Sequence, residues 1–212
     1  MRDFLLFFVS LFSIVNPLST IPIYLGLTTD IPAPERKRLT RQASLTVFVV
    51  LAASYLAGKG LLSFFGISVA SLKVAGGLVI LAMSWSMLQA RMSAAKQTPE
   101  EAHDVEQPSG EGPNIAVIPL GMPLLAGPGS ISVMIIAAGK TQGLTGHVSV
   151  LTAAAAVAAM CWVMLLAAMP IGRALGRTGM NVATRFMGLI LAAIAVEFIT
   201  SGLATIFPGL TR

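Results

Sequence analysis

The sequence predicts an all-α polytopic membrane bundle of six transmembrane helices. These form two inverted three-helix repeats, and the first and fourth spans are broken in the middle of the membrane. The prediction rests on the composition, the spacing of the apolar runs, and proline and glycine at matching places in the two halves. Of the 212 residues, 55% are hydrophobic and 11% are charged, whereas a soluble domain carries about 25% charged residues. With a mean hydropathy of +0.83, most of the chain must face lipid or other helices.

Six apolar runs approach or exceed the length of about 20 helical residues that crosses a bilayer. They cover 4–28, 43–65, 69–88, 115–139, 148–170 and 182–207. None shows the alternation of apolar and polar residues that a membrane β-strand requires, so we expect helices. The first run continues into Asn16-Pro17 without a small-residue cleavage site, so we expect it to remain as the first span.

A polar segment, 92–114, separates the third and fourth runs. It holds five of the nine acidic residues and cannot bury a core, so we expect a linker between a first repeat at 1–91 and a second at 115–212. His103 and the neighbouring acids lie in this linker, and we do not expect them to form a metal site. Cys161 is the only cysteine, which excludes a disulfide within the chain.

Basic residues gather at the ends of the apolar runs, so membrane orientation explains the net charge of +5 better than nucleic-acid binding does. Nine of them follow the first, third and fifth runs, against five on the opposite side. We therefore expect those three loops in the cytoplasm and both termini outside. The nine are Arg36, Lys37, Arg38, Arg41, Arg91, Lys96, Arg173, Arg177 and Arg185.

The two halves of the chain resemble each other. Segment 71–76 aligns with 183–188, which matches Lys73 with Arg185 and Gly76 with Gly188. Because each half has three spans, the second half must insert with the opposite topology. Inverted repeats of this kind are typical of secondary transporters.

Proline and glycine interrupt the first span of each half. Proline removes a helix donor and disfavours the α conformation in the residue before it, so we expect breaks near Asn16-Pro17 and across 123–129. The free N–H groups where each helix restarts favour an anion, and the leftover carbonyl groups favour an ammonium. Such a pair of breaks suits a zwitterion. The candidate substrate-binding residues are Asn16, Pro17, Ser19, Thr20, Gly127, Pro128, Gly129 and Ser130.

Glu197 is the only acidic residue well inside an apolar run. An intramembrane carboxylate usually faces the interior and marks a functional site, so Glu197 is the coupling candidate, with a hydrogen-bonded structural role as the alternative. The coupling ion, H+ or Na+, is left open, and we expect no cofactor or metal. The chain has no Walker loop, H-E-x-x-H or G-x-S-x-G motif, so we do not expect an enzyme.

Three segments resemble the MarC family of integral membrane proteins: 16–22, 119–131 and 187–196. The second segment is the most specific, because it is long and punctuated by proline and glycine. The resemblance covers nearly the whole chain outside the linker. It implies a six-span protein of a bacterial or archaeal inner membrane, grouped with transporters of small neutral amino acids such as glycine and alanine. Glu197 departs from the Gln that the family often has at this place.

The function expected from these observations is secondary transport of small neutral amino acids by alternating access. Efflux of drugs or other amphipathic molecules is an alternative, although it needs a wide aromatic cavity and the residues at the breaks are small. A non-transporting scaffold is a second alternative, although a scaffold gains nothing from unpaired backbone in lipid. The sequence does not predict the oligomeric state.

Overall fold

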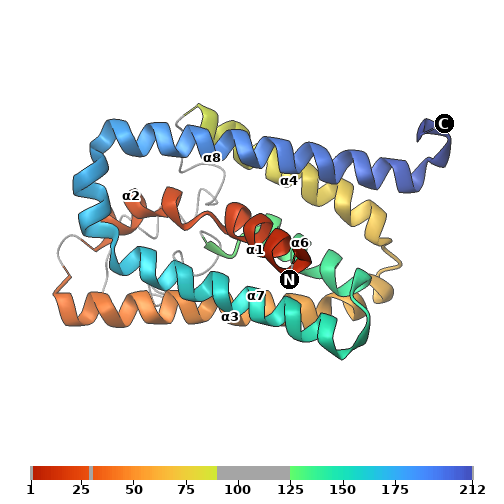
Figure 1. The fold of residues 1–212 in the computed structure, drawn as a ribbon, viewed down its shortest axis with the longest axis horizontal. Helices are drawn as coiled ribbons and strands as arrows, with labels where there is room; N and C mark the ends of the chain where they lie inside the picture. The colour runs from red at the N-terminus through yellow and green to blue at the C-terminus, as the bar shows by residue number, and fades with distance from the viewer. Residues whose placement is uncertain (1, 29–30, 90–124, 212) are drawn as a thin grey trace.

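A computed structural model describes residues 2–28, 31–89 and 125–211 of the chain. Every regular element in these ranges is helical, as the sequence predicts (Figure 1). The elements are α1 (Arg2–Val15), α2 (Pro17–Leu27), α3 (Ala33–Phe64), α4 (Val69–Leu88), α6 (Pro128–Lys140), α7 (Gly143–Leu166), α8 (Ala168–Ile206) and the short 3-10 helix η2 (Pro208–Thr211).

Five segments of the described chain are long and apolar enough to cross a membrane. They are Phe4–Leu27, Ala33–Phe64, Val69–Leu88, Gly143–Leu166 and Thr178–Ile206. The predicted linker and the first part of the fourth predicted run lie outside the described residues. The described remainder of that run is α6, whose 13 residues extend about 20 Å, less than the hydrocarbon core of about 30 Å. The count of six spans therefore stays a prediction.

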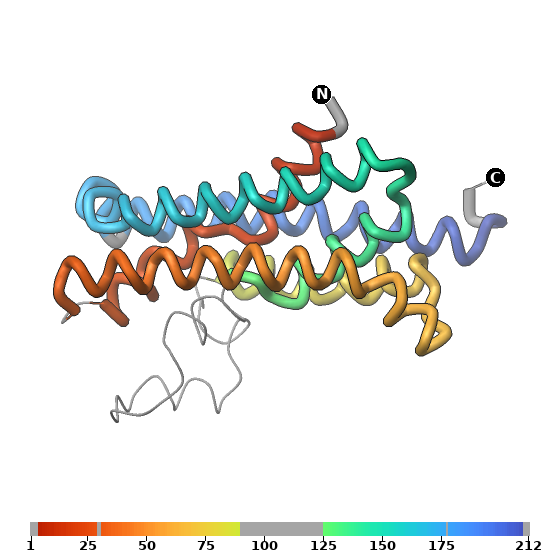
Figure 2. The backbone as a smooth tube through the Cα atoms, turned by 90° about the horizontal axis from the view of Figure 1, so that it is seen from below, coloured from red at the N-terminus to blue at the C-terminus, as the bar shows by residue number. Residues whose placement is uncertain are grey.

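Two pairs of helices form opposite walls of the bundle. α4 packs along α8 and α3 packs along α7, while α1, α2 and α6 lie between the walls and contact both (Figure 1). Seen from below, α1 and α6 run obliquely to the long helices (Figure 2). The apolar window of Phe4–Leu27 is 50% buried, against 17% for that of Thr178–Ile206. The chain of α1 and α2 is therefore central, and most of α8 is peripheral.

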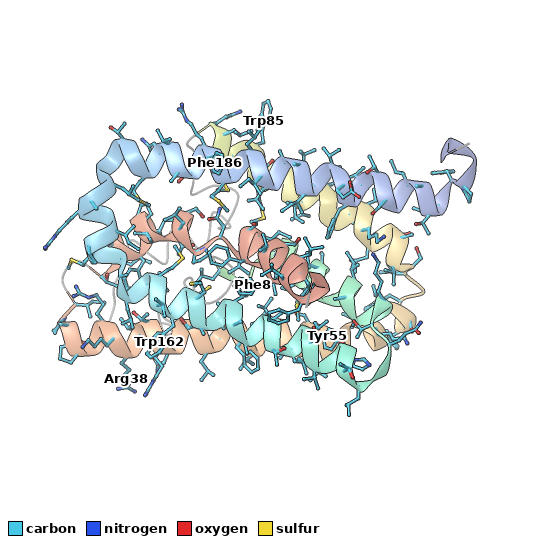
Figure 3. All side chains as sticks on the ribbon, in the orientation of Figure 1. Phe8, Arg38, Tyr55, Trp85, Trp162 and Phe186 are labelled. Atoms are coloured by element: carbon cyan, nitrogen blue, oxygen red, sulfur yellow. The ribbon has the colours of Figure 1, made fainter. Side chains whose placement is uncertain are left out.

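Large apolar side chains cover the outside of the bundle. Trp85 is 64% exposed and Phe186 is 63% exposed, and both point away from the helices (Figure 3). Leu11, Ile14 and Ile80 belong instead to a buried core that joins both walls to the central helices. An apolar surface of this extent indicates a molecule surrounded by lipid.

Helices α3 and α8 begin earlier than the apolar runs predict. The second run starts at 43, but α3 starts at Ala33, so Arg36 to Arg41 lie in a helix and not in a loop. The sixth run starts at 182, but α8 starts at Ala168 and bends at Gly176, where φ is 57°. A helix satisfies its own backbone groups on either side of the membrane boundary. Hydropathy therefore marks the part of a helix inside the membrane and not its ends.

A hydrogen bond joins α3 and α7 near one end of their wall. The sequence places His147 outside the apolar runs, but this residue lies in α7. Its Nδ1 is 2.6 Å from the Tyr55 Oη of α3, and the two rings meet edge to face. This contact fixes the position of α3 along α7, because two helices joined only by apolar side chains could slide past each other.

Glycine residues allow α4 and α8 to approach each other closely. A Cβ atom on Gly77 would lie 3.0 Å from the Ala195 carbonyl oxygen, and one on Gly202 would lie 2.9 Å from the Ala70 carbonyl oxygen. Backbone atoms can move away only if the helices separate. Small residues at such a seam let helices pack by van der Waals contact where lipid offers no hydrophobic driving force.

The aligned residues Gly76 and Gly188 pack in different places. A Cβ atom on Gly76 would lie 2.8 Å from the Ser132 Cβ of α6, whereas one on Gly188 would lie 3.2 Å from the Ser84 carbonyl oxygen of α4. The sequence match between them therefore does not extend to their packing partners.

We expect Gly202→Ala to destabilise the protein. The added methyl group must push α8 away from the Ala70 backbone, and overpacking of this kind costs about 1–3 kcal/mol. Gly60→Ala on α3 is the matched control, because a Cβ atom there meets nothing within 4 Å. Thermal unfolding in detergent should give a lower midpoint for Gly202→Ala alone. Equal midpoints for the two variants would contradict the close α4–α8 seam.

Candidate functional site

Asn16 separates α1 from α2. Its φ of 47° and ψ of 67° are left-handed, and among the described residues it alone, apart from glycine, has a positive φ. The proline after it disfavours the α region, and Asn adopts the left-handed region more readily than most residues. The Asn16 N–H donates the last bond of α1 to the Phe12 carbonyl oxygen at 2.8 Å. α1 thus ends and α2 begins on either side of Asn16, whereas a break in the middle of the membrane stays a prediction.

The Asn16 side chain is 1% exposed and caps α2. Its Oδ1 accepts the Ser19 N–H at 3.3 Å, which satisfies a donor that has no partner within the helix. Its Nδ2 donates to the Met87 Sδ of α4 at 3.8 Å. The amide group therefore holds α2 in place and links it to one wall of the bundle.

Helices α2 and α6 begin with the same local motif. Each has an N-cap residue, a proline at the first helical position and a serine at the third. The Ser19 Oγ donates to the Asn16 carbonyl oxygen at 3.0 Å, and the Ser130 Oγ donates to the Gly127 carbonyl oxygen at 2.9 Å. Proline suits this position because its missing N–H would have no helical acceptor. The two predicted groups of site residues thus form equivalent turns.

The start of α6 differs from that of α2 in having no side-chain cap. Pro128 has no N–H, and the Ile131 N–H donates to the Gly127 carbonyl oxygen at 3.1 Å. The N–H groups of Gly129 and Ser130 lie in the first turn of α6, where a helix supplies no acceptor of its own. Both residues are buried, while Pro128 is exposed. Buried N–H groups at a helix start attract an anion. This end of α6 is therefore suited to a carboxylate.

Gly129 brings the start of α6 close to the end of α1. A Cβ atom on Gly129 would lie 2.9 Å from the Ile80 Cγ1 of α4 and 3.3 Å from the Ile14 Cγ2 of α1. Ile14 lies two residues before Asn16, so the two interruptions meet in the middle of the bundle. A larger residue at 129 would push α6 away from both neighbours.

Two buried hydroxyl groups of the described chain have no hydrogen-bond partner. They are the Thr20 Oγ1 of α2 and the Ser44 Oγ of α3. Thr20 is fully buried and Ser44 is 6% exposed. A buried polar group without a partner costs about 1–3 kcal/mol. A molecule bound here would supply the missing partners.

Each of the two hydroxyl groups lies one turn from a residue that joins α2 to α3. A bond of 2.7 Å between the Tyr24 Oη and the Thr40 Oγ1 joins these helices, which run antiparallel (Figure 1). Thr20 lies one turn before Tyr24, and Ser44 lies one turn after Thr40, so each shares the face of its neighbour. We infer that Thr20 and Ser44 point toward the same interface, one turn deeper in the bundle.

Proline also leaves carbonyl groups without their helical donors. Pro17 lacks the N–H that would bond to the Ser13 carbonyl oxygen, and Pro22 lacks the one for Leu18. Ser13 is buried and Leu18 is half-buried. Carbonyl oxygens of this kind, next to the helix start, are suitable acceptors for an ammonium group.

Glu197 lies apart from these groups. Its side chain is exposed on α8, whereas the sequence predicts a carboxylate that faces the interior. The buried face of α8 includes Leu191 and Ala195, and Glu197 lies about 200° around the helix from Ala195. One turn further on, Ser201 accepts a hydrogen bond from the Lys73 Nζ of α4 at 3.4 Å. The predicted coupling residue thus belongs to the outer side of the α4–α8 wall.

Comparison with known proteins shows the family of this chain. The model of the MarC family integral membrane proteins matches residues 1–207. The chain belongs to the MarC family.

Relatives of this MarC-family chain carry the name UPF0056 membrane protein. YvbG of Bacillus subtilis (strain 168) is 40% identical over 204 residues, which cover 96% of this chain and 95% of the relative. YhcE of Escherichia coli (strain K12) is 36% identical over 204 residues, or 96% and 93% of the two chains. A relative from Methanocaldococcus jannaschii is 35% identical over 205 residues, or 96% and 97%. No solved structure matches the chain.

Two residues of the candidate site were not indicated by the sequence pattern. Ser44 and Met87 lie in apolar runs without proline, and their roles depend on contacts between helices. The only sequence signal for Ser44 is a hydroxyl group one turn after Thr40. Among the described residues, no group of three or more His, Cys, Asp or Glu side chains could hold a metal ion, and the segment around His103 lies outside these residues.

Substitution of Asn16 should separate its two roles. Asn16→Gly keeps the left-handed conformation without strain. It loses the contact with Met87 and the cap, and exchange of a capping side chain for glycine costs only a few tenths of a kcal/mol. Asn16→Ala loses the cap and must adopt a strained φ, so the free energy of unfolding should fall by about 2–3 kcal/mol. Thermal unfolding in detergent measures both variants. A Gly variant as unstable as the Ala variant would contradict the role of the left-handed conformation.

Proposed function

We propose that this MarC-family chain is a secondary transporter of small neutral amino acids of the glycine and alanine type. The substrate binds between the start of α2 and the start of α6. The observation that carries this proposal is the pair of unpartnered buried hydroxyl groups, Thr20 and Ser44, together with the start of α6, which has no side-chain cap. The resemblance to the MarC family supplies the substrate class.

The charge of the site favours a ligand with no net charge. Asn16, Ser19, Thr20, Ser44 and Ser130 are buried and neutral. In this proposal the carboxylate of the substrate accepts the N–H groups at the start of α6, where the helix dipole favours negative charge. Its ammonium group donates to the carbonyl oxygens that proline leaves free. The hydroxyl groups of Thr20 and Ser44 complete the contacts.

Close packing around the site favours a small side chain. Gly129 has Ile80 and Ile14 within contact distance of any added Cβ atom, and both are nearly fully buried. Each methylene group of a larger substrate would have to displace these core residues. Glycine and alanine carry zero or one side-chain carbon, and they fit this limit best.

We propose that the chain consists of two inverted repeats, 1–91 and 115–212, joined by the linker 92–114, and that transport proceeds by alternating access. The matching turns at Asn16 and Gly127 support the repeat. The pattern of helix pairs also supports it: exchange of the halves turns the α2–α7 pair into α6–α3 and the α2–α8 pair into α6–α4, and all four pairs are in contact. Rocking of one repeat against the other would expose the midplane site to each side in turn.

The remaining features of the proposal follow from charge and family. The chain lies in a bacterial or archaeal inner membrane, with the loops after the first, third and fifth spans in the cytoplasm and both termini outside. It has no catalytic role and needs no cofactor or nucleic acid. H+ or Na+ is the coupling ion, and Glu197, beside Ser201 and Lys73, is the coupling candidate.

Drug efflux is the alternative function that a ligand-binding measurement distinguishes most directly from amino acid transport. An efflux site would need an apolar chamber lined by aromatic side chains, and the groups between α2 and α6 are small and polar. A scaffold is the second alternative, and its stability would respond to none of these ligands.

We expect Thr20→Val and Ser44→Ala to weaken glycine and alanine binding without destabilising the empty protein. Each removes a hydroxyl group that has no partner, so the unliganded midpoint should stay the same or rise. Loss of a bond to the substrate should lower its affinity by about tenfold. The measurement is the thermal shift of the purified protein in detergent with glycine, L-alanine, L-lysine and a lipophilic drug, since a ligand of the folded state raises stability.

Thr46→Val is the matched control on α3, because the Thr46 Oγ1 already donates to the Gln42 carbonyl oxygen at 3.0 Å. It should leave the response to glycine unchanged. A wild-type shift with the drug and none with any amino acid would replace the proposal by efflux. A shift with glycine that both variants retain would place the substrate elsewhere.

A further inference from the structure

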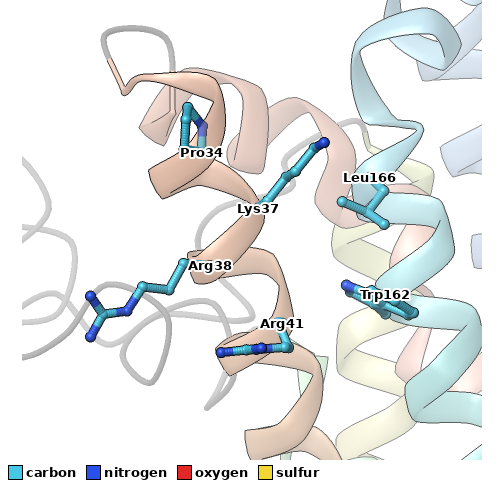
Figure 4. A pocket seen from close by; sticks show the side chains of 6 residues that line it. All are labelled: Pro34, Lys37, Arg38, Arg41, Trp162 and Leu166. Atoms are coloured by element: carbon cyan, nitrogen blue, oxygen red, sulfur yellow. The ribbon is translucent and has the colours of Figure 1, made fainter.

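A recess lies between the beginning of α3 and the end of α7, away from the proposed substrate site (Figure 4). It has a volume of about 490 Å³. Six residues line it: Pro34, Lys37, Arg38, Arg41, Trp162 and Leu166. The recess is large enough for a polar headgroup and lies open at the side of the bundle.

The residues of α3 present a single basic face to the recess. Lys37, Arg38 and Arg41 follow Pro34 at spacings that place them on one side of a helix. All three cations are exposed, and among the described residues no acidic side chain lines the recess. In Figure 4 Lys37 extends toward α7, whereas Arg38 extends outward from α3. An anionic group in the recess would therefore meet positive charge from one side.

The residues of α7 form the opposite, apolar side of the recess. Trp162 and Leu166 lie one turn apart, and each is 42% exposed. Tryptophan, whose ring is apolar but carries a polar N–H group, is typical of the boundary between lipid and water. This side thus offers contact to an acyl chain below the level of the cations.

Helix length places the recess at this boundary. α3 has 32 residues and extends about 48 Å, well beyond a hydrocarbon core of about 30 Å. The charged turns at its beginning must lie in the headgroup region. α7 ends at Leu166, beside these turns, so its last turn reaches the same level. The recess therefore opens where lipid headgroups are.

We propose that this recess binds the headgroup of an anionic phospholipid. The phosphate accepts charge-assisted hydrogen bonds from Lys37 and Arg41, and an acyl chain lies against Trp162 and Leu166. Basic pockets between transmembrane helices recognise anionic headgroups in this way. A soluble anion would use only the basic side, whereas a lipid uses both sides.

The test uses Trp162 as a reporter. The chain has two tryptophan residues, so Trp85→Phe leaves Trp162 as the only one. The full-length variant is reconstituted in bilayers that contain brominated phosphatidylglycerol or brominated phosphatidylcholine, and quenching of its fluorescence is compared. We expect stronger quenching by the anionic lipid. The preference should fall by about fivefold for each cation removed in Lys37→Gln/Arg41→Gln, as each interfacial cation contributes about 1 kcal/mol.

Arg36→Gln/Arg173→Gln is the matched control, since it removes the same charge from the ends of α3 and α8 without touching the recess. The control should retain the preference for the anionic lipid. The proposal is overturned by equal quenching from the two lipids, by a preference that survives Lys37→Gln/Arg41→Gln, or by an equal loss in the control. It is also overturned if inorganic phosphate at millimolar concentration abolishes the preference, because the recess would then bind a soluble anion.

Discussion

A peptide group that loses its helical partner inside a bilayer must find another, because hydrocarbon offers none. Pro17, Pro22 and Pro128 each remove a donor from the central helices of this chain. Some of the loss is repaired within the protein: Asn16 caps α2, and Ser19 and Ser130 donate to the carbonyl groups of their own N-caps. The groups that remain, at the start of α6 and in the last turn of α1, lie in the interior, where a polar ligand can reach them and lipid cannot.

This constraint explains why the bundle has walls and a centre. The long helices α3, α4, α7 and α8 have few interruptions and turn apolar side chains outward, so they can face lipid along their length. The interrupted elements α1, α2 and α6 cannot do so, and each contacts both walls. The glycine seam between α4 and α8 makes one wall compact. The walls thus provide a lipid-compatible frame for polar backbone that could not exist at the surface.

The sequence predicted the parts of this structure that depend on local chemistry. The helical class followed from hydropathy, and the interruption at Asn16 followed from the proline beside it. The two serine residues were found because they share a motif with those prolines. Residues whose roles depend on a neighbouring helix were not predicted: Ser44 and Met87 lie in unremarkable apolar runs.

Other predictions were wrong or incomplete because they depend on how the helices pack, which the local sequence does not show. An acidic residue inside an apolar run was expected to face the interior, but the orientation of α8 turns Glu197 outward. The beginnings of α3 and α8 were placed too late in the sequence, because hydropathy does not detect helical turns that lie outside the membrane. The second interruption falls partly on residues beyond the described ranges, so its predicted extent, 123–129, stays a prediction.

The bond between Tyr55 and His147 has a mechanical consequence for the wall that contains it. It ties α3 to α7 near one end, while near the other end the recess lies between the same two helices. Because the Tyr55–His147 bond fixes α3 to α7 at one point, a tilt of α3 relative to α7 would pivot about this bond. A group that fills or leaves the recess would then tilt α3 about this bond and displace Ser44, which lies between Tyr55 and the recess residues along α3.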